Sequence, residues 1–394
     1  MKEKSSKLQL ALSSLNHFTV DGYSAMLTPL WPAIMTIFSL SQGTTALIAA
    51  SLGVIVAFIQ PVGAILGIKF GEKRMQILSV LLSAIFIPLI GAVNSLIVLV
   101  IFLTLGRIGN GFFHPNAAAF VGKLGFSHEH TAMSLFSIGG SLGGAIIPVL
   151  IVWYVKLFGF HSMYFLTFFG LIVAILSFLY LPTFKESADH VEQMPGFGLK
   201  DSLSVKGVKE LILVIVLRSL ALMMFSNLLP LYLKQIGESL IWGGYFLTLS
   251  ALAGTVGNYF GAILSDRIGP KNVNVLSIFA AFPFALFLVL IRNVYIMLTM
   301  YTIMAFFAYF TMASNVSYMQ EFLPHRKGIA SSLGMGISWG MASSIFVGIS
   351  LVINSIGLHT VLFFGVFSLV VAAVISLKLP KVKKSVASSV EQSS

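Results

Sequence analysis

The chain has 394 residues, of which 57% are hydrophobic and only 9% are charged, whereas soluble domains contain about 25% charged residues, so a water-soluble globule is excluded. The formal net charge is +11, but the basic residues are spread thinly along the chain, and a nucleic-acid surface requires a concentrated basic face. Because cysteine is absent, a disulfide framework, a zinc–thiolate site and a thiol nucleophile are also excluded.

Twelve apolar stretches are each long enough for a membrane-spanning helix, which needs roughly 20 residues. Charged or turn-forming residues separate them, as at 71–74, 127–130 and 324–327. We therefore predict an all-α membrane protein with twelve transmembrane helices. The predicted spans are 8–38, 44–70, 76–95, 97–123, 130–157, 161–182, 208–236, 241–266, 272–291, 294–321, 327–356 and 358–379.

The longest break between spans, residues 183–207, has the composition of a solvated linker, with Lys185, Glu186, Asp189 and Pro195. It divides the chain into an N-terminal bundle of six helices (1–182) and a C-terminal bundle of six helices with a short tail (208–394). Most of the 24 Lys and Arg residues lie on one side when both termini and the linker are placed there. The positive-inside rule makes that side the cytoplasm.

The sequence repeats itself at an offset of 198 residues. The run Gly-Ala-Ile-Leu at 63–66 recurs at 261–264, and Gly71 recurs as Gly269. A repeat of six spans keeps both copies in the same orientation, so a pseudo-two-fold axis along the membrane normal relates the two bundles. Two parallel bundles with a cavity between them are suited to alternating access.

Several motifs resemble the major facilitator superfamily. Residues 266–271 (Asp-Arg-Ile-Gly-Pro-Lys) match its loop between spans 8 and 9, and residues 68–74 keep the glycine and basic residues, with Ile68 where the family has Asp. The run Arg-Ile-Gly-Asn-Gly at 107–111 resembles its intramembrane arginine motif. The resemblance implies the fold of that family. The loop residues that we expect to contribute to gating are Gly71, Asp266, Arg267 and Gly269.

A narrower resemblance links residues 16–21, 60–63, 113–116 and 137–143 to the fosmidomycin-resistance branch of bacterial efflux proteins. The Phe-His-Pro sequence at 113–115 is the most distinctive of these motifs. The resemblance implies proton-driven export of a small drug or metabolite across a bacterial inner membrane. We expect a monomer whose partners are the substrate, protons and the lipid bilayer, without nucleic acid or a cofactor.

The ionisable residues deep inside the predicted spans are His17, Asp21, Arg107, His114 and Arg218. Such groups are costly in a membrane and usually face a bundle interior or a wet cavity. At a rise of about 1.5 Å per residue, His17, His114 and Arg218 share one depth and Asp21 lies a turn above them. Helical spacing places His17 and Asp21 on one face, and Arg107 and His114 on another.

Asp21 is the one acidic residue near mid-membrane, and we predict that it carries the proton, with His17, His114 and Arg107 in the same proton-coupling network. A dry environment and an arginine-paired environment favour opposite protonation states of a carboxyl group. A permanent structural pair of Asp21 with Arg107 or His17 is the alternative. The two histidines also have purely structural alternatives. A histidine often hydrogen-bonds to a neighbouring helix, and the motif around His114 could serve only to kink span 4 at Pro115. We predict no metal site.

Arg218 has no acidic partner at its depth in its own half, so we expect it to face the cavity, with snorkelling to the interface as the alternative. Two buried arginines against one aspartate favour an anionic or zwitterionic substrate. The residues that we predict to bind substrate are Gln60, Asn110, Phe113, Arg218, Tyr245 and Asn315.

Four functions compete for such a chain. We favour a proton-coupled exporter, and the alternative in the same class is a proton-coupled importer or facilitator of an organic anion or a sugar-like metabolite. A membrane-embedded enzyme is disfavoured because the chain has neither a His-Glu-x-x-His sequence nor clustered aspartates at membrane depth. Glycine-rich spans 5 and 11 permit helices to pack closely and slide, which argues against a fixed channel.

Overall fold

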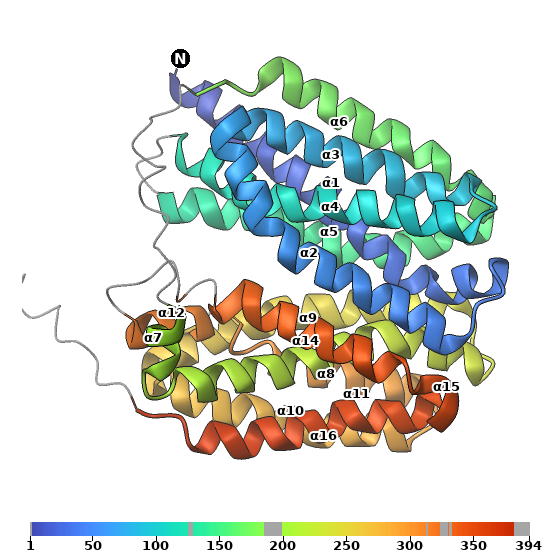
Figure 1. The fold of residues 1–394 in the computed structure, drawn as a ribbon, viewed down its shortest axis with the longest axis vertical. Coiled ribbons are helices and arrows are strands. Elements are labelled where there is room, and N and C mark those ends of the chain that lie inside the picture. The colour runs from blue at the N-terminus through green and yellow to red at the C-terminus, as the bar shows by residue number, and fades with distance from the viewer. Residues whose placement is uncertain are drawn as a thin grey trace, which may run out of the picture.

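The computed structural model describes residues 2–124, 129–184, 199–312, 314–323, 330 and 333–381. These residues form helices and turns without any strand, which confirms the all-α class. The helices make two groups, seen one above the other in Figure 1. The first group contains α1 (Lys2–Ile37), α2 (Gln42–Phe70), α3 (Glu72–Leu89), η1 (Ile90–Ala92), α4 (Leu96–Gly122), α5 (Glu129–Phe158), η2 (Phe160–Leu166) and α6 (Thr167–Tyr180). The second contains α7 (Leu199–Ser204), α8 (Val208–Gln235), α9 (Leu240–Ile268), α10 (Pro270–Leu290), α11 (Val294–Ala308), α12 (Ser314–Phe322), η4 (Leu333–Ile337), α14 (Ser338–Ser350), α15 (Ile353–Ile356) and α16 (Leu358–Leu377).

The helix bounds follow the predicted spans to within a few residues in most cases. Among the described residues, nine helices are long and apolar enough to cross a membrane. The first predicted span also forms, as α1, but it is less apolar because it carries Asn16, His17 and Asp21. The predicted linker lies mostly outside the described residues, apart from its end, where α7 forms.

Two predicted spans of the second half are not continuous α-helices. Span 10 is divided into α11 and α12, and in the turn between them the Met312 amide donates to the Tyr309 carbonyl at 3.0 Å. Span 11 includes η4, a π-helix, before α14. Irregular backbone at membrane depth is tolerated where it is buried or lines a cavity, and π-helical segments often mark functional sites.

The internal repeat reappears in the backbone at the same offset of 198 residues. Helices α2, α3 and α4 begin at residues 42, 72 and 96, and α9, α10 and α11 begin at 240, 270 and 294. Positive backbone φ angles also recur in pairs, at Ser39 with Gly237, Gly71 with Gly269, and Gly159 with Gly357. These pairs are turns at the same place in each half, so the sequence repeat is a structural repeat.

One pair of histidine contacts follows the repeat as well. His161 Nδ1 lies 2.6 Å from the Gly91 carbonyl oxygen. His359 Nε2 lies 2.9 Å from the Val289 carbonyl oxygen, and both residues of this contact are 198 positions later in the chain. Each histidine therefore ties the last span of its half to the end of the third span.

The two halves meet through equivalent helices, since α2 packs on α14 and α5 packs on α9. Polar contacts join them where α1 turns into α2. There, Lys234 Nζ donates to the Pro32 carbonyl at 3.0 Å, and the Gly43 amide donates to Asn354 Oδ1 at 3.0 Å. Asn354 also donates to Ser41 Oγ at 2.8 Å. The halves are thus fastened together at the end where α1 and α8 finish.

Candidate functional site

A polar cavity of about 610 Å³ lies between the two halves. Helices α1, α2 and α4 line one side, and α8, the turn after α11, η4 and α14 line the other. Its polar lining residues are Asp21, Ser24, Thr28, Gln60, Arg107, Asn110, His114, Ser226, Asn227 and Ser343. Its larger apolar lining residues are Leu27, Trp31, Leu52, Val56, Met223, Met312, Trp339 and Phe346.

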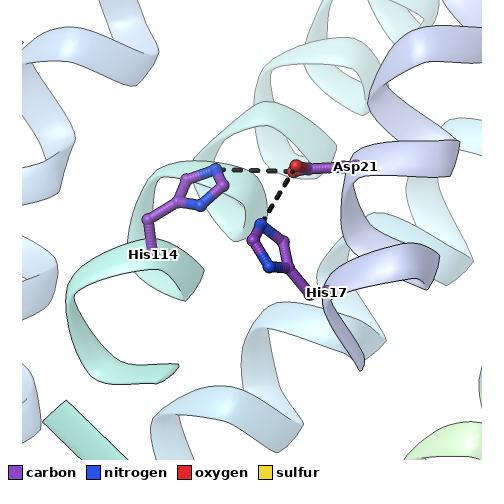
Figure 2. A group of neighbouring side chains, drawn as sticks. All are labelled: His17, Asp21 and His114. Carbon is purple, nitrogen blue, oxygen red and sulfur yellow. Dashed lines mark ion pairs between the residues drawn. The ribbon is translucent and has the colours of Figure 1, made fainter. Parts of the chain in front are cut away.

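Asp21 lies between two histidines in the wall of this cavity (Figure 2). Its Oδ2 is 3.2 Å from His17 Nε2, and its Oδ1 is 3.4 Å from His114 Nε2. Asn110 donates from Nδ2 to the same Oδ1 at 3.1 Å. Helices α1 and α4 thereby bring four side chains into one hydrogen-bonded group. The Asp21 side chain remains 25% exposed, so solvent in the cavity reaches it.

His17 is held on its other side by α5. Its Nδ1 lies 3.0 Å from the Phe136 carbonyl oxygen, and its ring stacks on the Phe136 ring with centroids 4.4 Å apart. A carbonyl oxygen only accepts hydrogen bonds, so Nδ1 carries a hydrogen and donates it. The other nitrogen, Nε2, is then the one directed at Asp21. This orientation is set by the backbone of α5 and not by the cavity.

Glycines of α5 allow α1 to approach closely enough for these contacts. A Cβ atom added to Gly139 would lie 2.3 Å from the Ser14 carbonyl oxygen, and one added to Gly143 would lie 2.3 Å from that of Phe18. A Cβ atom at Gly140 would lie 2.3 Å from His17 Nε2. The glycines of span 5 therefore leave the space that the His17 ring occupies.

We expect Gly140→Ala to reduce transport by roughly 10- to 100-fold, because the new methyl group must displace the His17 ring from Asp21 and small misplacements of reacting groups are costly. Gly144→Ala is the matched control, since its added Cβ atom would have no neighbour within 4 Å on the same helix. Transport into proteoliposomes with equal amounts of each variant is the measurement. Equal rates for the two variants would contradict this role of Gly140.

Arg107 lines the same cavity from α4. No ion pair within 4.0 Å joins it to an acidic side chain of the described residues, and its Nε has no hydrogen-bond partner there. The ion-pair contacts of Asp21 are made with His17 and His114. Of the two structural pairs considered for Asp21, the geometry therefore corresponds to the one with His17.

Arg218 lies away from this group, inside the second half. It is 2% exposed, and Nη1 donates to Thr311 Oγ1 in the turn that follows α11. It is not among the residues that line the 610 Å³ cavity. Its burial also means that the guanidinium does not reach a water interface, so the snorkelling alternative does not apply in this conformation.

The other residues predicted to bind substrate fall into two groups. Gln60 and Asn110 line the cavity. Phe113 is fully buried behind His17, with ring centroids 5.4 Å apart. Tyr245 contacts Trp242 near the start of α9, with centroids 5.9 Å apart. Asn315 is buried and accepts a hydrogen bond from Asn274 at 2.8 Å, so these last three do not touch the cavity.

The four residues predicted for gating lie at two equivalent turns. Gly71 has a φ angle of 87° between α2 and α3, and Gly269 has one of 86° between α9 and α10. A positive φ of this size favours glycine, which lacks a Cβ atom. Asp266 and Arg267 are exposed just before the second turn. Beside the first turn, Glu72 and Lys123 form an ion pair that joins α3 to α4.

The sequence gives no indication of the aromatic part of the cavity. Trp31 and Trp339 both line it, one from each half, together with Asn227 on α8. Met312 and Gly336 reach it from the interrupted parts of spans 10 and 11. Tryptophan in an apolar span reads as a packing or interface residue, and a helix break within a uniformly apolar run leaves no compositional mark.

His17, Asp21 and His114 offer donor atoms that lie within 4.8 Å of one another, which is compatible with a metal ion. Protons account for the same spacing, because 3.2 and 3.4 Å are contact distances between hydrogen-bonding groups. The geometry is thus compatible with the prediction from the sequence that protons, and not a metal ion, occupy this group.

Comparison with known proteins identifies the family. The family model described as Major Facilitator Superfamily matches residues 14–347. The chain belongs to the major facilitator superfamily. Among curated members of the superfamily, the transporter YfnC of Bacillus subtilis is 23% identical over 95% of this chain and 93% of its own length. The fosmidomycin resistance protein of Escherichia coli is 24% identical over 84% of this chain and 83% of its own length.

A solved structure of a major facilitator protein has the same fold. The nucleoside transporter NupG superposes with a TM-score of 0.77 at 17% sequence identity, over 95% of this chain and 98% of that chain. The predicted arrangement of two helical bundles is therefore confirmed at the level of the fold. The protein is a multi-pass membrane transporter and not an enzyme, which confirms the class favoured from the sequence.

Proposed function

We propose that this protein couples the movement of a small anionic or zwitterionic molecule to the movement of protons, with Asp21 as the proton-binding group. The observation that carries the proposal is the placement of Asp21 in the wall of the cavity between the halves, in contact with His17 and His114. A protonatable group that borders the substrate space can respond to each state of an alternating-access cycle. Membership of the major facilitator superfamily is the reason to propose an alternating-access cycle.

Orientation follows from the distribution of basic residues. With both termini in the cytoplasm of a bacterial cell, the fastened end of the molecule, at Lys234 and Pro32, faces outward. The Gly71 and Gly269 turns then face the cytoplasm, where we propose that they and the neighbouring Asp266 and Arg267 act in gating. The contacts between the halves at Lys234 and Asn354 then lie on the outer side of the cavity.

Two directions of transport are compatible with this site. The likeness to a fosmidomycin resistance protein supports efflux by proton antiport. The second candidate is uptake of an organic anion together with a proton, and it is supported by the position of Arg107 in the same wall as the protonatable pair of His17 and Asp21.

Resistance in living cells tests the proposed efflux. If the protein works as an exporter, bacteria that express it should tolerate more fosmidomycin than cells with an empty vector, and an uncoupler should remove the difference at doses that do not affect growth. Cells expressing Asp21→Asn at equal membrane levels are the matched control. Increased sensitivity to the drug would indicate uptake, and resistance that survives the uncoupler would refute proton coupling.

A further inference from the structure

The titratable and charged side chains that face the cavity are Asp21, Arg107 and His114, with His17 directly behind Asp21. Helices α2, α8 and α14 contribute polar but uncharged lining residues to the same space. The net charge of the cavity is therefore decided by where protons reside in the first half. The hydrogen bonds of His17 determine whether a proton lies between His17 and Asp21.

The Nδ1 hydrogen of His17 is donated to the Phe136 carbonyl oxygen, which lies 3.0 Å from Nδ1. If His17 carried no second hydrogen and Asp21 were ionised, the lone pair of Nε2 would face the Oδ2 lone pairs at 3.2 Å. Two acceptors in direct contact with no hydrogen between them are unfavourable. One proton must therefore lie between His17 and Asp21 in this conformation.

This shared proton makes the pair neutral as a whole. An imidazolium facing a carboxylate and a neutral imidazole facing a carboxylic acid have the same total charge of zero. His114 adds no obligatory charge, because its neutral form can donate from Nε2 to Asp21. Asp21 thus does not cancel the charge of Arg107, which stays protonated in proteins.

Arg107 is consequently the unbalanced charge of the cavity. Its Nε lacks a hydrogen-bond partner, and the ion pairs among the described residues leave it without a carboxylate. Burying a cation without a partner is costly. A guanidinium also presents its donors in a fork that matches carboxylate and phosphonate oxygens in pairs. Asn110, three residues along α4, and Trp31 line the surrounding space.

We propose that Arg107 binds the oxyanion of the substrate, and that the proton shared by His17 and Asp21 keeps Arg107 available for it. Loss of that proton leaves a carboxylate whose charge balances Arg107, so the anion is released. Proton and anion then bind together, which is the condition for symport. This inference rests on the proposed proton coupling at Asp21 and makes the uptake of an organic anion the favoured direction.

Binding to the purified full-length protein tests the inference without any transport step. Trp31 and Trp339 report on the cavity once Trp153→Phe and Trp242→Phe have removed the other two of the four tryptophans. The probes are phenylphosphonate and, as a cation of similar size, phenyltrimethylammonium. We expect a saturable fluorescence response to phenylphosphonate alone.

Charge variants identify the anchor. Arg107→Gln should weaken phenylphosphonate binding by about 10- to 100-fold, as expected for charged hydrogen bonds, and Arg107→Lys should recover part of it. Arg292→Gln, an exposed residue between α10 and α11, is the matched control. The inference is overturned if Arg107→Gln binds as the wild type does, if only Arg218→Gln loses binding, or if phenyltrimethylammonium binds and phenylphosphonate does not.

Variants of the proton pair separate this inference from the proposed function. His17→Gln removes the shared proton and should weaken phenylphosphonate binding about tenfold, whereas Asp21→Asn should retain it and the double variant should recover it. A purely structural His17 would give no recovery in the double variant, which would refute the charge argument. Normal binding by Asp21→Asn together with unimpaired proton-driven transport would instead refute the proposed role of Asp21 and leave Arg107 as the anion site.

Discussion

Asp21→Asn is expected to abolish proton-driven accumulation of substrate in proteoliposomes, with a loss of about 100-fold or more, the range in which one positioned proton-transfer group acts. The amide keeps the size of the side chain and its contact with His17, but it cannot take up a proton. Exchange of labelled for unlabelled substrate requires no net proton movement, so it should continue. A selective loss of accumulation is thus the expected signature.

Glu238→Gln provides the comparison for that variant, because Glu238 lies in the short connection between α8 and α9 and outside the polar cavity. It should accumulate substrate as the wild type does. If Asp21→Asn accumulated substrate normally, Asp21 would be a structural partner of His17, and the proton would be carried elsewhere. If both accumulation and exchange disappeared, the variant would have damaged the site as a whole.

Gly261→Ala is expected to lower the free energy of unfolding by about 1–3 kcal/mol, the usual cost of overpacking a well-packed interior. A Cβ atom at this position would lie 2.0 Å from the Phe310 carbonyl oxygen, a backbone atom that cannot move aside alone. Helix α9 would have to separate from the turn between α11 and α12. The midpoint of thermal unfolding in detergent should fall accordingly.

Gly348→Ala tests whether this loss comes from the contact and not from the substitution itself. Gly348 is in α14, and an added Cβ atom would have no neighbour within 4 Å. Because alanine favours a helix over glycine by about 0.8–1 kcal/mol, this variant should be unchanged or more stable. Opposite signs for the two variants are expected, and a Gly261→Ala protein as stable as the wild type would contradict the close approach.

Helix positions could be predicted because a membrane imposes a minimum apolar length that is visible in composition. The repeat could be predicted for a related reason, since turns such as Gly71 and Gly269 need the same residue in each half. The depth of each residue in the membrane could also be predicted, because the rise per residue of a helix is fixed. The contact of His17, Asp21 and His114 joins residues that these rules had placed on neighbouring levels.

Rotation about the helix axis and interruption of the helix could not be predicted in the same way. Arg218 has a suitable depth but turns toward Thr311, inside its own half. Tyr245 and Asn315 were predicted to bind substrate in the cavity, but their side chains pack against Trp242 and Asn274 instead. Which face of a helix meets the cavity depends on the packing of all its neighbours, and a single apolar sequence carries little information about it.

The most direct test of coupling between proton and substrate is the internal pH of sealed proteoliposomes after an organic anion is added outside, with no initial pH gradient. If the anion at Arg107 and the proton shared by His17 and Asp21 occupy the cavity together, the interior should become acidic in the wild type. Asp21→Asn should give no change in internal pH. An interior that becomes alkaline would contradict joint binding and establish antiport. Entry of the anion without any pH change would contradict proton coupling altogether.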